Sequence, residues 1–329
     1  MISPDQLERS RAYCREITRR RARNFYLGLR LTPEPKRSSL YAIYAWMRRA
    51  DDIVDGDADD VVASPAGRAA ELERFASDSL AICDAVAGSE GGGSVRWPRA
   101  SEPATSNAPG QTGDTFWPAF TQAIQSYKIE RALIEDVFTS LRRDLDPLPM
   151  PSENELRSYC RGVASTVGVA CIRVWGLRAG ATSDDMARVD ELASRRGLAF
   201  QLTNILRDVG CDYDAEPRRV YLPADSLARA GLSASDLRHW READRCAAFI
   251  REWCHYAERE FIATEPLDDL VHSDGRAALQ AMTRTYRTLL GRLRERPELC
   301  VGPAASVPRR TKLWIASRAL LEQWVASRA

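Results

Sequence analysis

Metal-binding side chains of the zinc type are scarce in this chain of 329 residues. It holds only three histidines, and its eight cysteines form no Cys-x-x-Cys pair. Thiolate and imidazole side chains at short, regular spacings are the ligands of structural zinc sites, so the sequence offers no zinc site. Cys160 and Cys171 lie among apolar residues and are interpreted as small core residues.

Long apolar runs are missing as well. No stretch reaches the ~18 apolar residues of a membrane-spanning helix, and no charged-then-apolar leader opens the chain. These absences predict a cytoplasmic protein with reduced thiols. The net charge of +1 argues against non-specific binding of nucleic acid. With 44% apolar residues, the chain has enough apolar side chains for a sizeable core.

Alternating strand patterns are nowhere sustained, whereas helical spacing recurs along the whole chain. The sequence therefore predicts an all-α fold. The expected helices, besides the two that carry acidic residues and are described below, cover residues 3–30, 65–87, 156–177, 233–262, 273–296 and 311–327, with two more within 116–146. Residues 88–114 are rich in Gly, Ser, Pro and Thr, which indicates a flexible insertion in a single domain spanning residues 1–329.

The stretch from Gln201 to Asp212 predicts a buried helix with a polar stripe. Gln201, Asn204, Asp208 and Asp212 follow one another at steps of three, four and four residues, which places them on one face. Two acids one turn apart repel each other, so a cation is expected beside them. Arg207 points about 100° away from the stripe, which favours a divalent metal ion. The alternative is an ion-paired helix in the core.

A second helix with the same pattern favours the metal. The stretch from Tyr41 to Asp55 places Asp51 and Asp55 one turn apart, with Arg48 and Tyr44 on the turns before them. Two such helices can face each other across a cavity. Ligation by oxygen atoms alone suits Mg²⁺, which completes its octahedron with water and substrate phosphates. The sequence thus predicts a site for metal ions and diphosphate.

Three motifs together resemble those of the squalene and phytoene synthase family. Asp51-Asp-Ile-Val-Asp55 and the stretch from Gln201 to Pro223 resemble its two aspartate-rich motifs, and Tyr159-Cys-Arg-Gly-Val-Ala-Ser-Thr-Val-Gly168 resembles a third signature between them. The resemblance extends from Asn24 to Leu313. It implies a single helical bundle around a central cavity, the class I isoprenoid synthase fold.

The resemblance also implies a Mg²⁺-dependent transferase and assigns roles to residues. Two or more Mg²⁺ ions would bridge to the diphosphates of two allylic substrates, which condense head to head. The implied metal ligands are Asp51, Asp55, Asp208 and Asp212. The implied catalytic residues are Tyr44, Arg48, Tyr159 and Arg207. The implied substrate-binding residues are Arg21, Phe25, Gln201, Asn204, Arg219 and Tyr221.

The most specific expectation concerns the product of the condensation. The opening Asn24-Phe-Tyr-Leu-Gly28 resembles bacterial presqualene diphosphate synthases, and the chain lacks the C-terminal anchor of the reducing eukaryotic enzymes. Two farnesyl diphosphates are therefore expected to give presqualene diphosphate without NADPH. The alternative is condensation of two geranylgeranyl diphosphates to phytoene. An alternative of another class is a non-catalytic assembly or interaction factor of the same fold, which the presence of all four aspartates disfavours.

Two features depart from the family pattern or lie outside it. Cys211 stands where family members often carry Glu, so the second motif lacks one acid. The last expected helix, 311–327, combines six large apolar residues with basic ones, a profile of an interfacial helix and of peripheral contact with a membrane. The alternative for this helix is ordinary core packing. Nothing in the sequence indicates an oligomeric state.

Overall fold

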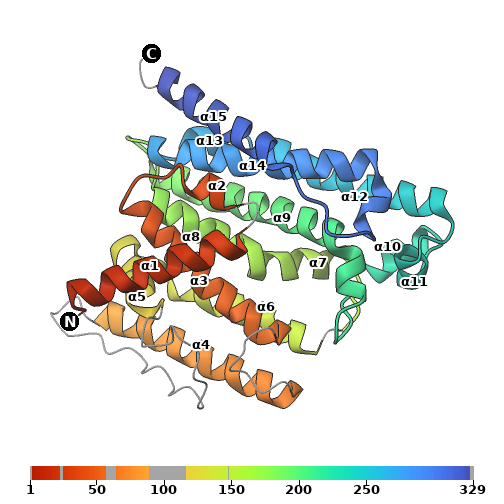
Figure 1. Cartoon of the computed structure of the whole chain (residues 1–329), viewed down its shortest axis with the longest axis horizontal. Coiled ribbons are helices and arrows are strands. Elements are labelled where there is room, and N and C mark those ends of the chain that lie inside the picture. The colour runs from red at the N-terminus through yellow and green to blue at the C-terminus, as the bar shows by residue number, and fades with distance from the viewer. Residues whose placement is uncertain (1, 23–24, 57–63, 89–115, 147, 327–329) are drawn as a thin grey trace. The chain divides into compact units, whose positions relative to one another are not determined.

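The computed structural model describes residues 2–22, 25–56, 64–88, 116–146 and 148–326 (Figure 1). Within these residues the regular structure is helical, and one isolated antiparallel bridge between Leu177 and Val271 is the only strand-like pairing. The predicted all-α fold is confirmed. The chain divides into two compact units, Met1–Leu145 and Asp146–Ala329, which are described in turn. The single-domain organisation stays a prediction, and the insertion at 88–114 lies outside the described residues, apart from Gly88.

The first unit is organised around one central helix. Its helices are α1 (Pro4–Arg21), α2 (Tyr26–Leu29), α3 (Lys36–Asp55), α4 (Pro65–Gly88), α5 (Trp117–Tyr127) and α6 (Arg131–Leu145). Helix α3 packs against each of the other five, and α4 also packs against α5 and α6. The helix that carries the first acid pair is therefore held from several sides within its own unit.

An aromatic cluster fixes α3 in this unit. Trp46 of α3 is 1% exposed, and its ring stacks on Phe120 of α5 at a centroid distance of 5.0 Å. Phe138 of α6 meets the same indole edge-on at 5.7 Å. The indole Nε1 donates a 2.9 Å hydrogen bond to Ser79 Oγ of α4, so the one polar atom of the ring is satisfied. Such rings bury large areas, which locks the acid-bearing helix in position.

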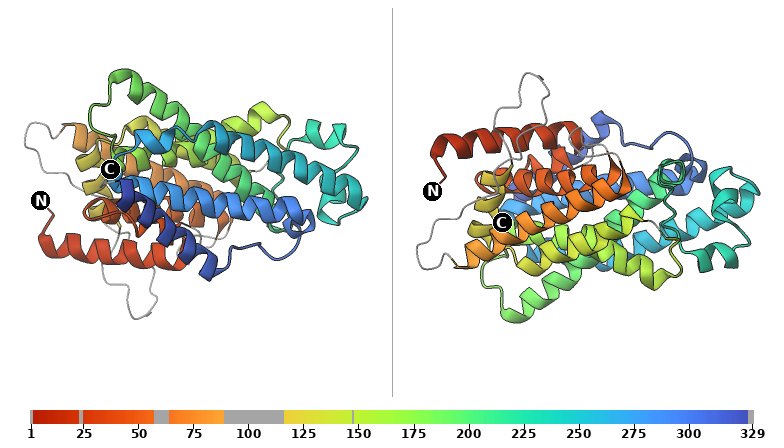
Figure 2. Two further views of the ribbon diagram at one scale, coloured as in Figure 1. Left: turned by 90° about the horizontal axis from the view of Figure 1, so that it is seen from above. Right: turned by 90° about the horizontal axis from the view of Figure 1, so that it is seen from below.

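The second unit is organised around the longest helix. It holds α7 (Glu153–Cys160), a π-helix η2 (Arg161–Ser165), α8 (Thr166–Trp175), α9 (Ser183–Tyr213), α10 (Ala224–Arg229), α11 (Ala234–Arg238), α12 (Ala243–Ala263), α13 (Leu267–Leu270), α14 (Ser273–Glu295), a 3-10 helix η3 (Pro297–Cys300) and α15 (Arg309–Ala326). Helix α9 packs against α7, α8, α12 and α14, and Figure 2 shows α12 and α14 side by side. Its start is capped by Thr182, which forms a capping box with Asp185.

A buried arginine anchors the middle of α9. Arg196 is 2% exposed, and its guanidinium donates to Thr264 Oγ1 and to the Thr264 carbonyl, both at 2.7 Å. It also donates to Thr283 Oγ1 at 2.5 Å and forms an ion pair with Asp268 at 3.3 Å. Because its donors face several acceptors, the buried charge is compensated. This network ties α9 to α13, α14 and the end of α12.

Close packing along α9 explains the small residues of the third motif. A Cβ on Gly197 would lie 2.7 Å from the Ser165 Cα atom, and one on Gly168 would lie 3.1 Å from the Ala193 carbonyl oxygen. The Ser165 hydroxyl also donates a 2.6 Å hydrogen bond to the Ser194 carbonyl. The small-residue face of 156–177 therefore lets two helices approach closely.

Three predicted helices differ from the structure. The helix expected over 233–262 is divided into α11 and α12, because Trp240 and Glu242 between them have a positive φ of 53°. The helix expected over 3–30 ends at Arg21, because Ala22 leaves the helical conformation (φ −83°, ψ 54°), and the separate helix α2 follows. The helix expected over 156–177 is interrupted by the π-helix η2 where α9 packs most closely, and it ends at Trp175 before Gly176 (φ 79°). Spacing of apolar residues shows neither a π-turn nor the exact residue at which a helix ends.

Candidate active site

The first acid pair lies at the C-terminal end of α3. Tyr44, Arg48, Asp51 and Asp55 follow one another at helical spacing, and all four side chains are half-buried. The helix ends at Gly56, whose φ of 74° is favourable for glycine and whose N–H donates to the Asp52 carbonyl. The predicted spacing of the first motif is therefore present as one face of one helix.

The arginine of this helix pairs with the acid between the two predicted ligands. Arg48 forms an ion pair with Asp52, one turn further on. Arg21 Nη2 at the end of α1 lies 3.7 Å from the same Asp52 carboxylate. Asp52 thus engages both predicted phosphate-binding arginines of this unit. Phe25 lies nearby in sequence, half-buried at the start of α2.

Asp51 lies in an environment that disfavours its charge. Its pKa is raised to about 8, mainly by burial and next by the charge of Asp55, while Arg48 opposes both effects. Asp144 of α6 is a further acid that raises the pKa of Asp51. A carboxyl group in such a place binds a proton in the absence of a cation, and a nearby metal ion would reverse that preference.

Two residues of this site were missed by the sequence analysis. Asp144 is buried on α6, and its sequence context, a helix end between arginines and a proline, carries no sign of a role. Arg68 of α4 is buried, and its Nη1 donates a 3.2 Å hydrogen bond to the Val54 carbonyl near the end of α3. A cation at a helix C-terminus is electrostatically favourable. Only tertiary packing brings either residue to the acid pair.

The second acid pair lies at the C-terminal end of α9. Asn204 Nδ2 donates to Gln201 Oε1 at 3.4 Å, while Asn204 Oδ1 is buried and has no hydrogen-bond partner among the described residues. One turn later, Arg207 Nε donates to Asp208 Oδ1 at 2.7 Å. Burial lowers the pKa of Arg207, but the hydrogen bonds to Asp208 and the negative charge of Asp208 together raise the pKa above its usual value. The predicted stripe is present, and Arg207 reaches Asp208 despite its different direction along the helix.

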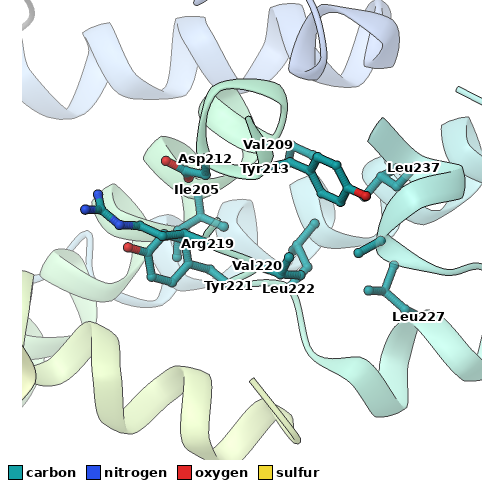
Figure 3. A pocket seen from close by; sticks show the side chains of 11 residues that line it. Ile205, Val209, Asp212, Tyr213, Arg219, Val220, Tyr221, Leu222, Leu227 and Leu237 are labelled. Carbon is teal, nitrogen blue, oxygen red and sulfur yellow. The ribbon is translucent and has the colours of Figure 1, made fainter. Parts of the chain in front are cut away.

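The chain after α9 folds back onto the acid pair. The Arg219 N–H donates a 2.9 Å hydrogen bond to the Asp212 carbonyl, which holds the returning segment against the end of α9. A pocket forms between them (Figure 3). The polar ends of Asp212, Arg219 and Tyr221 lie at one side of this pocket, and Leu227 and Leu237 lie at the other. Its remaining lining is Ile205, Val209, Tyr213, Val220, Leu222 and Ala234.

The tyrosine of the third motif contacts Tyr221, one of the residues that line this pocket. The ring of Tyr159, at the end of α7, stacks on that of Tyr221 at a centroid distance of 5.0 Å and an angle of 22°. The structure therefore brings together Tyr159, Asp212, Arg219 and Tyr221, which are far apart in the sequence. Tyr213 also lines the pocket and was not predicted, because it follows the motif without any spacing signal.

The oxygen donors of both helices fit Mg²⁺. Each acid pair offers two carboxylates one turn apart, and the unpartnered Asn204 Oδ1 adds a neutral oxygen beside Asp208. In the described part of the chain, no three His, Cys, Asp or Glu side chains form a metal-binding group. A hard cation that takes few carboxylates and completes its shell with water and phosphate oxygens matches such a donor set.

Comparison with known proteins identifies the family. The family model described as squalene/phytoene synthase matches residues 18–313, which is most of the chain. The chain belongs to the squalene/phytoene synthase family. The resemblance seen in the three sequence motifs is confirmed, and the enzyme class expected from it, a transferase, is the class of this family.

Curated relatives and solved structures agree with this. Phytoene synthase 3 of Zea mays is 30% identical over 312 residues, 95% of this chain and 66% of that protein. The 15-cis-phytoene synthase of Synechococcus elongatus is 32% identical over 288 residues, 85% of this chain and 83% of that protein. The chain thus spans about two thirds of the maize relative.

A crystal structure of a dehydrosqualene synthase matches with a TM-score of 0.77 at 24% identity, covering 98% of this chain and 99% of that one. The squalene synthase HpnC from Alicyclobacillus acidocaldarius matches with a TM-score of 0.67 at 23% identity, covering 89% and 96%. At these identities the likeness shows the fold alone, and it confirms the predicted isoprenoid synthase fold.

Proposed function

We propose that this protein condenses two geranylgeranyl diphosphates head to head to phytoene. Relatives named phytoene synthases, 30–32% identical over 85–95% of this chain, carry this proposal. These relatives favour phytoene, which was the alternative product in the sequence analysis, over presqualene diphosphate. The solved structures named for squalene and dehydrosqualene synthases are less than 25% identical and support the fold alone.

The acids of both units would hold Mg²⁺. Asp51 and Asp55 on α3, and Asp208 and Asp212 on α9, supply carboxylate oxygens, with Asn204 as a neutral oxygen donor. When bound, Mg²⁺ supplies Lewis-acid stabilisation of the departing diphosphate. Arg21, Arg48 and Arg207 would turn from their present carboxylate partners to the diphosphate oxygens, because guanidinium groups bind both anions in the same geometry.

The tyrosines and the apolar residues of the pocket would stabilise the carbocation and shield it from water. Loss of the first diphosphate leaves an allylic cation, and the double bond of the second substrate attacks it to form a cyclopropyl ring with loss of a proton. The stacked rings of Tyr159 and Tyr221 offer an electron-rich face that stabilises a cation, and Tyr44 is a second candidate for this role or for accepting the proton. The apolar side of the pocket excludes water, which would otherwise quench the cation.

The atom balance of this reaction needs no reductant. One diphosphate and one proton leave when the cyclopropyl ring forms, and a second diphosphate and a second proton leave after the second ionisation opens the ring, so phytoene forms without NADPH. Squalene would require a hydride at that step. The presence or absence of an NADPH requirement therefore distinguishes the two products chemically.

The test is a product assay with the purified protein and Mg²⁺. Each prenyl diphosphate is supplied alone, with and without NADPH, and lipids are identified by mass. Phytoene from geranylgeranyl diphosphate, formed equally without NADPH and abolished by EDTA, is expected. Presqualene diphosphate or squalene from farnesyl diphosphate, with geranylgeranyl diphosphate left unused, would reject the proposed chain length and retain the reaction class. No diphosphate release from either substrate would favour the non-catalytic alternative.

A further inference from the structure

The C-terminal helix α15 carries most of the exposed apolar surface that the structure describes. Ten large apolar side chains are exposed within the described residues, and six of them lie on this one helix. Their exposed fractions range from 46% to 61%. These six residues, called the α15 stripe below, are Leu313, Trp314, Leu320, Leu321, Trp324 and Val325. Exposed apolar residues gathered in one place mark an interaction surface more often than scattered ones do.

The stripe is a continuous face of the helix. Its members form two rows at steps of seven and four residues, one starting at Leu313 and one at Trp314, which places them side by side along the helix. The face turned to α14 carries instead the buried residues Ile315, Ala316 and Ala319. Surface helices usually turn their large apolar residues inward. This helix turns two alanines and one isoleucine inward and both tryptophans outward.

Positive charge surrounds the stripe. Helix α15 contains four basic residues, Arg309, Arg310, Lys312 and Arg318, and one acid, Glu322, an excess of three positive charges. Arg309 and Arg310 are exposed at the start of the helix. Arg318 lies over the Trp314 ring at 5.6 Å and pairs with Glu322 at 2.8 Å. Tryptophan and arginine beside an apolar face are typical of helices that lie in a membrane interface.

We propose that the α15 stripe docks this protein on the surface of an anionic phospholipid bilayer, with the helix lying flat in the interface. Within the described residues, no helix combines the length and the apolar composition needed to cross a bilayer. Binding to a second copy of the chain is disfavoured, because pairing two such faces brings together two helices of like charge. Anionic headgroups instead complement the arginines while the stripe enters the acyl boundary. The proposal is independent of the reaction and its product.

Co-sedimentation with sucrose-loaded vesicles tests this docking. The full chain is mixed at low salt with vesicles of phosphatidylcholine alone or with added phosphatidylglycerol. Binding to the anionic vesicles, weakened by high salt and much weaker on the neutral ones, is expected. Removing both exposed arginines with Arg309→Ser/Arg310→Ser should weaken binding by about fivefold for each arginine. The matched control Arg15→Ser/Arg188→Ser removes two exposed arginines from α1 and α9 and should bind as the unaltered chain does.

A second pair of variants tests the apolar face. Trp314→Ser/Leu321→Ser should weaken binding by roughly tenfold or more, because two of the inserted side chains are lost. Met186→Ser/Ile262→Ser, which replaces two exposed apolar residues on other helices, should have no effect. Circular dichroism and melting temperatures verify that all variants fold. Equal binding by the stripe variant and the unaltered chain, or no binding to anionic vesicles at low salt, would overturn the proposal. A different result would also overturn it: light scattering shows that the unaltered chain is a dimer, the stripe variant is a monomer, and none of the proteins binds vesicles.

Discussion

The two acid-bearing helices have the same spacing of aspartates and different arginine partners. On α3, Arg48 pairs with the intervening Asp52, and the outer Asp51 has a pKa raised to about 8 by burial and then by the charge of Asp55. On α9, Arg207 pairs with Asp208 itself, which is a predicted ligand. The arginine of α3 therefore pairs with the residue between the two predicted ligands, whereas the arginine of α9 partly neutralises a predicted ligand.

The difference follows from where an acid lies relative to the arginine. Asp52 is four residues after Arg48, the spacing at which side chains on a helix meet. The position four residues after Arg207 is Cys211, an exposed thiol. Without an acid there, the Arg207 guanidinium turns to the adjacent Asp208. The two motifs thus differ in whether an acid stands one turn after the arginine, and their arginines have different partners.

The largest expected effect is on turnover. Asp51→Asn and Asp208→Asn each keep the side-chain volume and remove a carboxylate, so diphosphate release with Mg²⁺ should fall by roughly a hundredfold to a thousandfold. Stability should separate the two variants. Asp51→Asn should raise the melting temperature because it removes an unfavourable charge. Asp208→Asn should lower the free energy of unfolding by up to about 1 kcal/mol because Arg207 loses its partner.

Activity assays and thermal melts on the same preparations check this. Asp244→Asn, at an exposed acid at the start of α12, is the matched control and should change neither quantity. Full activity in either site variant would mean that the acid is structural. Equal shifts of melting temperature in both site variants would show that the two pairs are electrostatically alike.

A smaller effect is expected in the pH dependence of stability without metal. The pKa of Asp51 is about 8 when folded and about 4 when unfolded, so the folded state binds more protons between these values. Stability in EDTA should therefore decrease as pH rises from about 4 to 8. Asp51→Asn should remove this part of the decrease. Thermal melts across that range measure it.

The Asp208→Asn variant is the control for this pH test. Asp208→Asn should keep the contribution of Asp51 and therefore the wild-type slope of melting temperature against pH. Identical slopes for wild-type protein and Asp51→Asn would contradict the raised pKa. Added Mg²⁺ should flatten the wild-type curve, because a bound cation favours the ionised carboxylate.

The smallest effect is expected from making α9 resemble α3. Cys211→Glu places an acid one turn after Arg207, where the new carboxylate competes for the guanidinium and releases Asp208. The Mg²⁺ concentration for half-maximal rate should then fall by about twofold, in line with the energy of one exposed helical ion pair. Cys211→Gln has the same length without the charge and should behave as wild type. A rise in the Mg²⁺ requirement of Cys211→Glu would show that Arg207 does not compete with the metal.

Much of the helical architecture was predictable because apolar spacing records burial along a helix. The two acid pairs were predictable for the same reason, since their spacing within one helix is local. The C-terminal end of α1 and the π-turn at Arg161–Ser165 were not, because they depend on how neighbouring helices pack. The ion-pair partners of Arg48 and Arg207 also depend on the directions of their side chains, which a helical-wheel projection of the sequence does not show.

Helix α15 shows the same limit of prediction from sequence, here in which of its faces is buried. Its sequence is compatible with a packed helix and with an interfacial one, because apolar residues occur around its whole circumference. The structure shows which residues face α14 and leaves both tryptophans exposed. Which side a helix buries depends on its neighbours, and those neighbours come from elsewhere in the chain.

The amino-acid order was sufficient for the fold class, the family and the helical spacing of the four aspartates, because each rests on residues a few positions apart. Folding was required to bring Asp144 and Arg68 to the first acid pair and to stack Tyr159 on Tyr221 beside Asp212. These residues are separated by many helical turns along the chain. Their contacts arise because burying the apolar faces of α3 and of α9 brings distant helices of the same unit together, and at Asp51 burial also raises the pKa of the carboxyl group.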